Sequence, residues 1–319
     1  MASREVLAIV GESGSGKSVT SLAIMGLLPK TARVSGSVRY RGVELIGMAD
    51  KTKAKLRGLE IAMVFQDPMT SLNPVYRVGA QLAEAIRVHH HISKRAALGR
   101  AVRLLEVVGI PNAVERARNY PHEFSGGMRQ RAVIAMAIAN DPDIIIADEP
   151  TTALDVTVQA QILETIATAR EATGAAMILI THDLGVVAGA ADKVLVMYAG
   201  KPVEVGMVED IFYRPRMPYT VGLLGAMPRL DESDGGRLIP VRGAPPSLIN
   251  LPPGCPFSPR CPLVDQRCVD VEPSLEPVGP GHRAACHHAD RVPALAAEHL
   301  GSRLVPGPDE NYAPPGTTT

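Results

Sequence analysis

Residues 11–18 are the feature that most constrains the fold of this chain. They read Gly-Glu-Ser-Gly-Ser-Gly-Lys-Ser and fit G-x-x-x-x-G-K-[ST], the pattern of a phosphate-binding loop. The apolar run Val6–Val10 before the loop predicts a buried strand, and residues 18–28 after it predict a helix that stops at Pro29. This order of strand, loop and helix favours phosphate binding over a plain glycine-serine connection.

The residue types in the loop suit a nucleoside triphosphate. Its three glycines allow backbone N–H groups to turn inward toward phosphate oxygens, and the following helix adds the dipole of its N-terminus. The Lys17 ammonium is expected to reach the β- and γ-phosphates, and the Ser18 hydroxyl to ligate Mg²⁺. The residues predicted to hold ATP here are Gly11, Ser13, Gly14, Ser15, Gly16, Lys17, Ser18 and Val19.

A pair of acids follows a second predicted strand. Ile144–Ala147 is wholly apolar and ends in Asp148 and Glu149, which places two carboxylates at the carboxyl end of a buried strand. We expect Asp148 to hold the Mg²⁺ shell and Glu149 to orient and polarise the attacking water. The alternative, a strand that ends in two solvated acids, is much weaker beside a phosphate loop.

Three further groups are candidates for the same chemistry. Ser125-Gly126-Gly127 precedes a predicted helix and makes a second anion site, unless it is an ordinary N-cap. Gln66 and His182 each follow a predicted strand, where an amide can meet Mg²⁺ or water and an imidazole can sense the γ-phosphate. Asp155 lies just after the acid pair and is expected to touch a partner chain.

The chain as a whole predicts an α/β fold. Strands alternate with helices, which indicates a parallel sheet, and a helical block at about 75–135 is expected to form an inserted α-helical subdomain. We predict a nucleotide-binding domain over 1–230, a Pro/Gly/Cys-rich extension over 231–292 and a disordered tail over 293–319. Strand pairing is also expected near 34–42 as an edge strand, and at 194–205 as a hairpin.

Charge and hydropathy limit the partners. Lys+Arg and Asp+Glu number 33 each, so the chain lacks the basic excess typical of nucleic-acid binders. No apolar run approaches the roughly 18 residues of a membrane span, and the first apolar run leads into the phosphate loop rather than resembling a signal peptide. We therefore expect a cytosolic chain that reaches a membrane only through partner subunits.

Taken together, these motifs resemble the ATP-binding cassette (ABC) family over roughly residues 5–230. The phosphate loop, Gln66, Ser125-Gly126-Gly127, Asp148-Glu149, Asp155 and His182 stand in that family's order and at about its spacing. The resemblance implies a P-loop NTPase (RecA-like) core and ATP hydrolysis. It also implies that two ATPase subunits close head to tail, each ATP lying between one phosphate loop and the other chain's signature.

Other segments are similar to the ATPase subunits of oligopeptide/dipeptide importers. They are residues 65–74, the variant signature at 124–131, Pro218-Tyr219-Thr220 and the Cys-Pro-Phe-Ser-Pro-Arg-Cys-Pro stretch at 255–262. The resemblance implies two transmembrane permease subunits, an extracytoplasmic peptide-binding protein and a place on the cytoplasmic face of the membrane. Alternatives are an importer of nickel or another solute, a soluble ABC ATPase not linked to transport, and a non-hydrolysing regulatory module.

The sequence departs from the family at two places. Met128 stands where many cassettes have Gln, a position at which this subfamily varies. Family members also begin with an antiparallel strand pair that carries an adenine-stacking aromatic, and no such segment fits before Val6. We interpret this as a start internal to a longer product, and expect an extension to tighten ATP binding.

All four cysteines of the chain lie in the extension, as C-x5-C-x6-C-x17-C. Zinc sites usually contain a closer cysteine pair, whereas wider spacing suits a [4Fe–4S] cluster, which the importer resemblance also implies. We predict the cluster on Cys255, Cys261, Cys268 and Cys286. Zinc, with His282 or His287 as a further ligand, and unliganded thiols are the two alternatives.

Overall fold

The computed structural model describes residues 1–152, 155–227, 241 and 243–300. Contacts divide the chain into two units, each of which is described by itself. Unit 1 comprises Met1–Val186 and Ala190–Asp192, and unit 2 comprises Val187–Gly189 and the chain from Lys193 onward.

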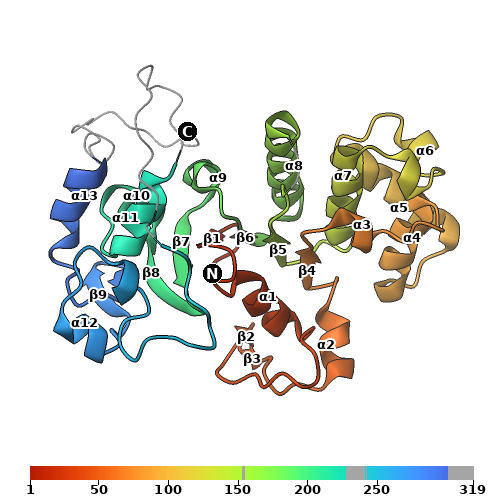
Figure 1. Ribbon diagram of the computed structural model, residues 1–319. Coiled ribbons are helices and arrows are strands. Elements are labelled where there is room, and N and C mark those ends of the chain that lie inside the picture. The colour runs from red at the N-terminus through yellow and green to blue at the C-terminus, as the bar shows by residue number, and fades with distance from the viewer. Residues whose placement is uncertain (153–154, 228–240, 242, 301–319) are drawn as a thin grey trace. The chain divides into compact units, whose positions relative to one another are not determined.

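Unit 1 is built on four parallel strands, and it confirms the expected α/β fold. They run in the order β4 (Ile61–Val64), β5 (Ile144–Asp148), β6 (Ala176–Ile180) and β1 (Val6–Val10) (Figure 1). Nearly all of their side chains are buried, which explains why the strands read as continuous apolar runs rather than alternating ones. The carboxyl ends of β4, β5 and β6 therefore lie at one edge of the sheet.

Helices of unit 1 follow the strands, with two differences from expectation. Helix α1 (Lys17–Met25) ends before Pro29, because Gly26 takes a left-handed conformation (φ 65°) and its N–H bonds back to the last turn. The predicted edge strand at 34–42 is instead a short antiparallel ribbon of β2 (Arg39–Tyr40) and β3 (Val43–Glu44). The remaining helices around the sheet are α2 (Asp50–Leu56), α8 (Val156–Thr173) and α9 (Leu184–Ala190).

The helical block expected at about 75–135 consists of several separate helices. Helix α4 (Val78–His89) stops where His90 becomes extended, and α5 (Lys94–Val107) begins with Ser93 as its N-cap. The Ser93 side chain accepts a hydrogen bond from the Ala96 N–H at 3.2 Å. The other elements are α3 (Pro68–Ser71), α6 (Ala113–Arg116), the 3-10 turn η1 (Pro121–Glu123) and α7 (Gly126–Ala137).

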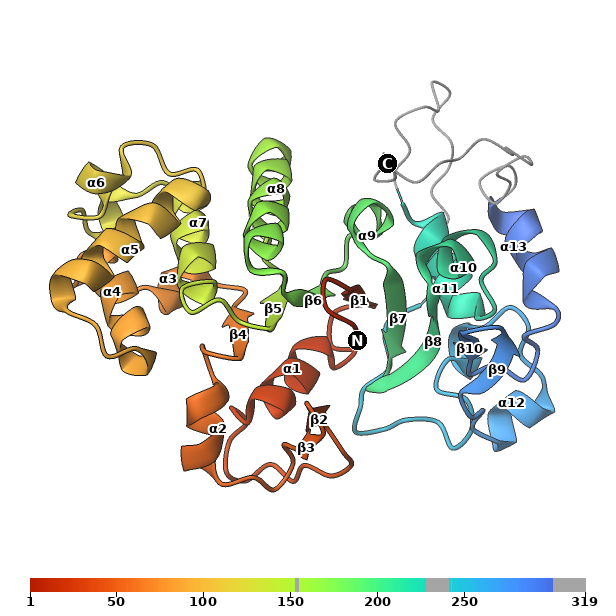
Figure 2. The same cartoon turned by 180° about the vertical axis from the view of Figure 1, so that it is seen from behind.

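Unit 2 carries antiparallel strands in the order β7 (Lys193–Tyr198), β8 (Lys201–Met207), β10 (His282–Ala284) and β9 (Glu276–Gly279). The predicted hairpin is confirmed: β7 and β8 turn at Ala199 and Gly200, both with positive φ, as two-residue hairpins prefer. Figure 2 shows this group of strands from behind. The helices are α10 (Val208–Tyr213), α11 (Pro218–Gly225), η2 (Ser258–Arg260), α12 (Gln266–Asp270) and α13 (Val292–Leu300).

The C-terminal expectations meet the structure only in part. Residues 293–300, expected within a disordered tail, belong to α13, whose Val292, Leu295 and Ala296 are buried. The rest of that tail, and most of the expected boundary near 230, lie outside the described residues, so the domain limits stay a prediction. Among the described helices, none combines the length and the apolar content that crossing a membrane requires.

Candidate functional site

The phosphate loop begins where β1 ends and leads into α1. Gly14 (φ 79°) and Gly16 (φ 98°) adopt left-handed backbone conformations that side chains rarely take, and Gly16 is the N-cap of α1. The Ser15 N–H donates to the Glu12 carbonyl at 3.2 Å, which closes a tight turn. The glycine pattern therefore serves the loop backbone, as the sequence predicted.

Lys17 lies inside this loop with only 5% of its surface exposed. Its Nζ donates to the Gly11 and Glu12 carbonyls at 2.8 and 3.1 Å. Burial lowers the pKa of Lys17, while the Glu149 and Asp148 carboxylates act in the opposite direction. The buried Ser15 hydroxyl has no hydrogen-bond partner among the described residues. A buried cation beside an unsatisfied hydroxyl fits a phosphate group.

Asp148, at the end of β5, meets the first turn of α1. The Ser18 hydroxyl donates to Asp148 Oδ1 at 2.8 Å. Burial raises the pKa of Asp148, and the hydrogen bond from Ser18 opposes that rise. The Ser18 hydroxyl and the Asp148 carboxylate are hard oxygen donors of the kind that Mg²⁺ prefers, and they already lie within hydrogen-bond distance of each other. The residues present therefore fit this ion.

Glu149 joins the ends of three parallel strands. Its Oε2 accepts a hydrogen bond from Gln66 Nε2, after β4, at 3.1 Å and lies 3.6 Å from Nδ1 of His182, after β6. It also accepts from the Thr152 hydroxyl at 2.9 Å. Glu149 itself has a positive φ of 46°, which re-aims the chain directly after the strand. The structure thus brings Gln66, Glu149 and His182 together, as their strand-end positions suggested.

Sequence reasoning missed two supporting contacts at this edge of the sheet. Thr152 was not singled out, although a threonine three residues after Glu149 is a plausible local hydrogen-bond donor. Asp183, next to His182, accepts from Gln159 Nε2 of α8 at 3.0 Å and from the Gly185 N–H at 2.9 Å. These bonds hold the loop that carries His182 against α8.

The Ser-Gly-Gly signature caps α7. The Ser125 hydroxyl accepts from the Met128 N–H at 3.3 Å, so its hydrogen bonds go to its own helix and not to the phosphate loop. Ser125 and Gly126 are exposed. Gly127 is close to α8: a Cβ atom on it would lie 3.0 Å from Val158 Cγ1. Helices α7 and α8 lie side by side in both views (Figures 1 and 2).

Asp155 caps the N-terminus of α8. Its Oδ1 accepts from the Val158 N–H at 2.9 Å, and its side chain is exposed. The same residue is therefore a helix cap within this chain and remains open to a second molecule.

The four cysteines lie in unit 2 and are unpaired thiols. Burial is the main cause of a raised pKa at each, to about 11 for Cys261 and about 12 for Cys286, and neighbouring thiols raise both further. The thiols therefore lie within electrostatic range of one another. The His288 N–H also donates to Cys286 Sγ at 3.4 Å.

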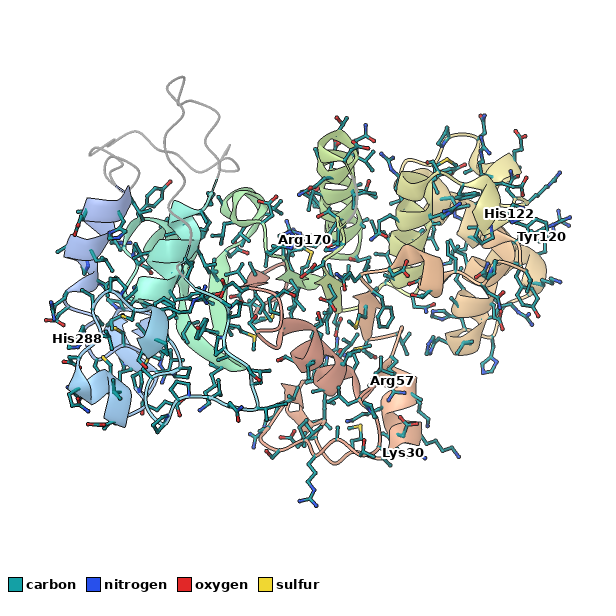
Figure 3. All side chains as sticks on the ribbon, in the orientation of Figure 1. Lys30, Arg57, Tyr120, His122, Arg170 and His288 are labelled. Atoms are coloured by element: carbon teal, nitrogen blue, oxygen red, sulfur yellow. The ribbon has the colours of Figure 1, made fainter. Side chains whose placement is uncertain are left out.

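The histidines near the thiols differ from those considered in the sequence. His282 is buried against Glu204, and His287 Nε2 contacts the Val271 carbonyl, so neither is aimed at the thiols. His288 is the histidine beside them (Figure 3): one of its ring nitrogens, one Asp265 oxygen and Cys268 Sγ lie within 4.8 Å of one another. The spacing of the cysteines gave no signal for this histidine.

Comparison with known proteins places the chain in a family. A sequence model of the ABC transporter family matches residues 1–152, and one of the oligopeptide/dipeptide transporter C-terminal region matches residues 203–268. The chain belongs to the ATP-binding cassette family. Within that family it belongs with the oligopeptide and dipeptide transport ATP-binding proteins.

Three relatives illustrate the likeness. The oligopeptide transport ATP-binding protein OppD of Salmonella typhimurium is 53% identical over 282 residues, 88% of this chain and 84% of the relative. The dipeptide transport ATP-binding protein DppD of Bacillus subtilis is 53% identical over 297 residues, 92% and 87% of the two chains. OppD of Mycobacterium tuberculosis is 59% identical over 297 residues, 93% of this chain, which spans only 48% of that relative.

A solved structure agrees with the fold. The ATP-binding cassette MJ0796, in a dimeric post-hydrolysis state bound to ADP and Pi, superposes with a TM-score of 0.58 at 27% identity. The match covers 65% of this chain and 87% of MJ0796.

Proposed function

We propose that this chain binds and hydrolyses ATP as a subunit of an importer for oligopeptides or dipeptides. The observation that carries the proposal is the gathering of Lys17, the Ser18–Asp148 pair and the Glu149 cluster at the loop and strand ends of one parallel sheet. The names of the relatives support the peptide cargo.

The phosphate loop performs the binding step in this proposal. The N-terminus of α1 and the backbone N–H groups of the loop, apart from that of Ser15, which donates to Glu12, would face the phosphates, and Lys17 would exchange its two carbonyl partners for phosphate oxygens. The residues that hold Mg²⁺ are Ser18, Asp148 and Gln66. When bound, the ion neutralises charge that develops on the phosphate oxygens.

Glu149 performs the hydrolytic step. Its carboxylate orients a water molecule and accepts a proton from it as the water attacks the γ-phosphate. Gln66 and Thr152 hold the carboxylate by hydrogen bonds, and His182, 3.6 Å from it, is placed to donate to the γ-phosphate. Pre-positioned donors of this kind need no rearrangement at the moment of reaction.

A second ATPase chain completes the site. Ser125, Gly126 and Gly127 present a helix N-terminus whose first two residues are exposed, so their free N–H groups and hydroxyl suit a phosphate held by another chain. Asp155, also exposed, is assigned to the same interface. In a homologous, head-to-tail pair, the signature of one chain would face the other chain's nucleotide and Asp155 would lie at the interface. MJ0796 is described as dimeric.

The membrane connection also belongs to the proposal. The chain would act on the cytoplasmic face of the membrane through two transmembrane permease subunits, and an extracytoplasmic peptide-binding protein would deliver the cargo. Its balanced charge, with 33 basic and 33 acidic residues, gives no reason to add a nucleic-acid partner.

Reconstituted transport tests the function. Vesicles that contain this chain, its permease subunits and its partner ATPase should take up a labelled tripeptide only when ATP is supplied on the side of the ATPase chains. Uptake of labelled nickel, and not of the tripeptide, would show that the transported solute is nickel. ATP hydrolysis that never moves a solute would point to a soluble ABC ATPase.

We also propose a [4Fe–4S] cluster on Cys255, Cys261, Cys268 and Cys286. Neighbouring thiols raise the pKa of Cys261 and of Cys286, and the backbone N–H of His288 donates to the Cys286 sulfur. Hydrogen bonds to sulfur are a usual means of stabilising thiolate ligands. The segment is rich in proline, so the bonds to iron would supply order that a small apolar core does not.

Metal analysis of anaerobically purified protein tests the cluster. We expect about four irons per chain and a broad absorbance band near roughly 400 nm. Cys261→Ser should bleach the band and loosen unit 2 to protease, while ATP binding is largely kept. The Asp265, Cys268 and His288 donors also suit zinc. If the analysis finds stoichiometric zinc and no iron, the site is a zinc site and the proposed cluster is wrong.

A further inference from the structure

Unit 2 contains a cavity of about 330 Å³ that uses none of the residues assigned to ATP. Its inner wall is apolar and comes from separate segments: Tyr198 ends β7, Val203 lies in β8, and Phe257 and Leu275 come from later loops. A volume of this size, walled by apolar and aromatic groups, is at the lower end of small-molecule sites.

The wall is preformed. Tyr198 and Phe257 are each only 2% exposed and meet edge to face, with ring centroids 5.2 Å apart. Tyr219 packs on both rings, at 4.6 and 5.5 Å. Arg260 lies over the Tyr198 and Phe257 rings at 5.8 and 5.9 Å. Such a cluster holds its shape, so a ligand would lose little binding free energy in ordering the wall.

Two opposite charges also line the cavity, and both are solvent-accessible. Lys201 Nζ lies 2.5 Å from Glu272 Oε1, and the two side chains are 53% and 39% exposed. An exposed ion pair contributes little to stability, so a ligand that offers each partner a new counter-ion can separate the two side chains. A ligand with one charge would leave the other residue without its partner.

We propose that this cavity binds a free α-amino acid with an apolar side chain. Its carboxylate would pair with Lys201 and its ammonium with Glu272, while the side chain enters the cavity, whose wall includes Tyr198, Phe257 and Leu275. The adjacent opposite charges of an α-amino acid match the adjacent opposite charges of the pair. The inference does not rest on the transport function, because every residue it uses lies in unit 2.

Calorimetry on the full chain tests the inference with L-phenylalanine as the probe. Two analogues of the same ring size, 3-phenylpropionate and 2-phenylethylamine, each lack one of the two charges. Because an exposed charge forms only a weak ion pair, each analogue should bind about threefold to fivefold more weakly than L-phenylalanine. Equal affinity for all three would show apolar partitioning without a zwitterion site, and overturn the inference.

Variants assign the binding to this cavity. Lys201→Met and Glu272→Gln should each weaken L-phenylalanine binding about threefold to fivefold, and Leu275→Trp should abolish it by filling the space. Lys193→Met and Glu276→Gln, exposed charges that do not line the cavity, are matched controls and should bind normally. Unaltered affinity in Lys201→Met and Leu275→Trp, or no binding by the unmodified chain, would refute the site. Unchanged thermal midpoints show that the variants fold.

Discussion

Glu149 is the residue on which the proposed hydrolysis most depends. Glu149→Gln keeps the shape and the Gln66 and Thr152 neighbours but removes the base, so ATP turnover should fall about 10²–10⁴-fold while ATP still binds. ATPase assays and nucleotide titrations on the assembled transporter measure both effects. Lys17→Ala is the contrasting control, since it should weaken binding itself. A Glu149→Gln complex with normal turnover would remove Glu149 from the mechanism.

Asp148 combines a binding role with a cost in stability. Burial raises its pKa above the ordinary value of 3.8, so the folded chain holds this proton more tightly than the unfolded chain does. The stability that Asp148 contributes is therefore present below pH 3.8 and is lost as the pH rises through the folded pKa. Above the folded pKa, the ionised carboxylate destabilises the nucleotide-free fold.

Asp148→Asn should therefore act in opposite directions on two measurements. Without nucleotide at pH 7, its thermal midpoint should exceed that of the unmodified chain. The further rise on adding Mg²⁺ and ATP should be smaller, because a carboxylate ligand is missing. Differential scanning calorimetry records both. A lower midpoint without nucleotide would mean that the Ser18–Asp148 hydrogen bond outweighs the burial of the charge.

At the scale of elements, the sequence predicted those whose ends carry a chemical signal. Helix α8 runs from Val156 to Thr173, because Asp155 caps its start and the left-handed Gly174 ends it. The meeting of Gln66, Glu149 and His182 was also predictable, since parallel strands place their carboxyl ends at one edge. These signals are local, and tertiary packing did not override them.

The elements that were missed depend on tertiary contacts. Helix α13 lies in a segment without clear caps, and its burial of Leu295 and Ala296 could not be read from composition. The contact of Thr152 with Glu149 depends on the left-handed backbone of Glu149, an unusual conformation for that residue. His288 approaches Cys268 only because the chain folds back after β10.

The buried pair of His282 and Glu204 links strands β10 and β8. His282 Nε2 lies 2.8 Å from Glu204 Oε1, which also accepts the Arg216 N–H at 2.6 Å, and Glu204 is fully buried. Burial raises the pKa of Glu204, and Oε1 keeps the Arg216 N–H, so His282→Ala removes one partner of a buried carboxyl group and the free energy of unfolding should fall by about 1–3 kcal/mol. Urea denaturation measures the loss.

His287→Ala is the matched control, since His287 is half-buried and its ring lies 2.8 Å from the Val271 carbonyl, not beside a buried carboxylate. It should change the free energy of unfolding by less than about 1 kcal/mol. Equal effects of the two substitutions would mean that the buried pair has no special part in holding β10 on β8.

At the scale of the whole molecule, the proposed function assigns anion binding to two helix ends of one chain. The phosphate loop opens into α1, whereas Ser125 caps α7 and bonds only within its own helix. One nucleotide needs one phosphate loop, so the second helix end is available to a nucleotide held by another chain. Nucleotide binding and chain association should therefore be one coupled event.

ATP-driven association of the Glu149→Gln chain tests that coupling. Because the bound ATP is not hydrolysed, sedimentation should show a dimer with ATP and a monomer without it. Adding Ser125→Arg should abolish the dimer, because the large arginine side chain would occupy the exposed N-terminus of α7. ATP binding should be preserved, because the phosphate loop is unchanged. Ser125→Thr keeps the cap and should dimerise normally. If the Glu149→Gln chain binds ATP but stays monomeric alone, its partner in the pair must be a different, homologous subunit. If Ser125→Arg dimerises as well as its parent, the signature does not contact the second nucleotide.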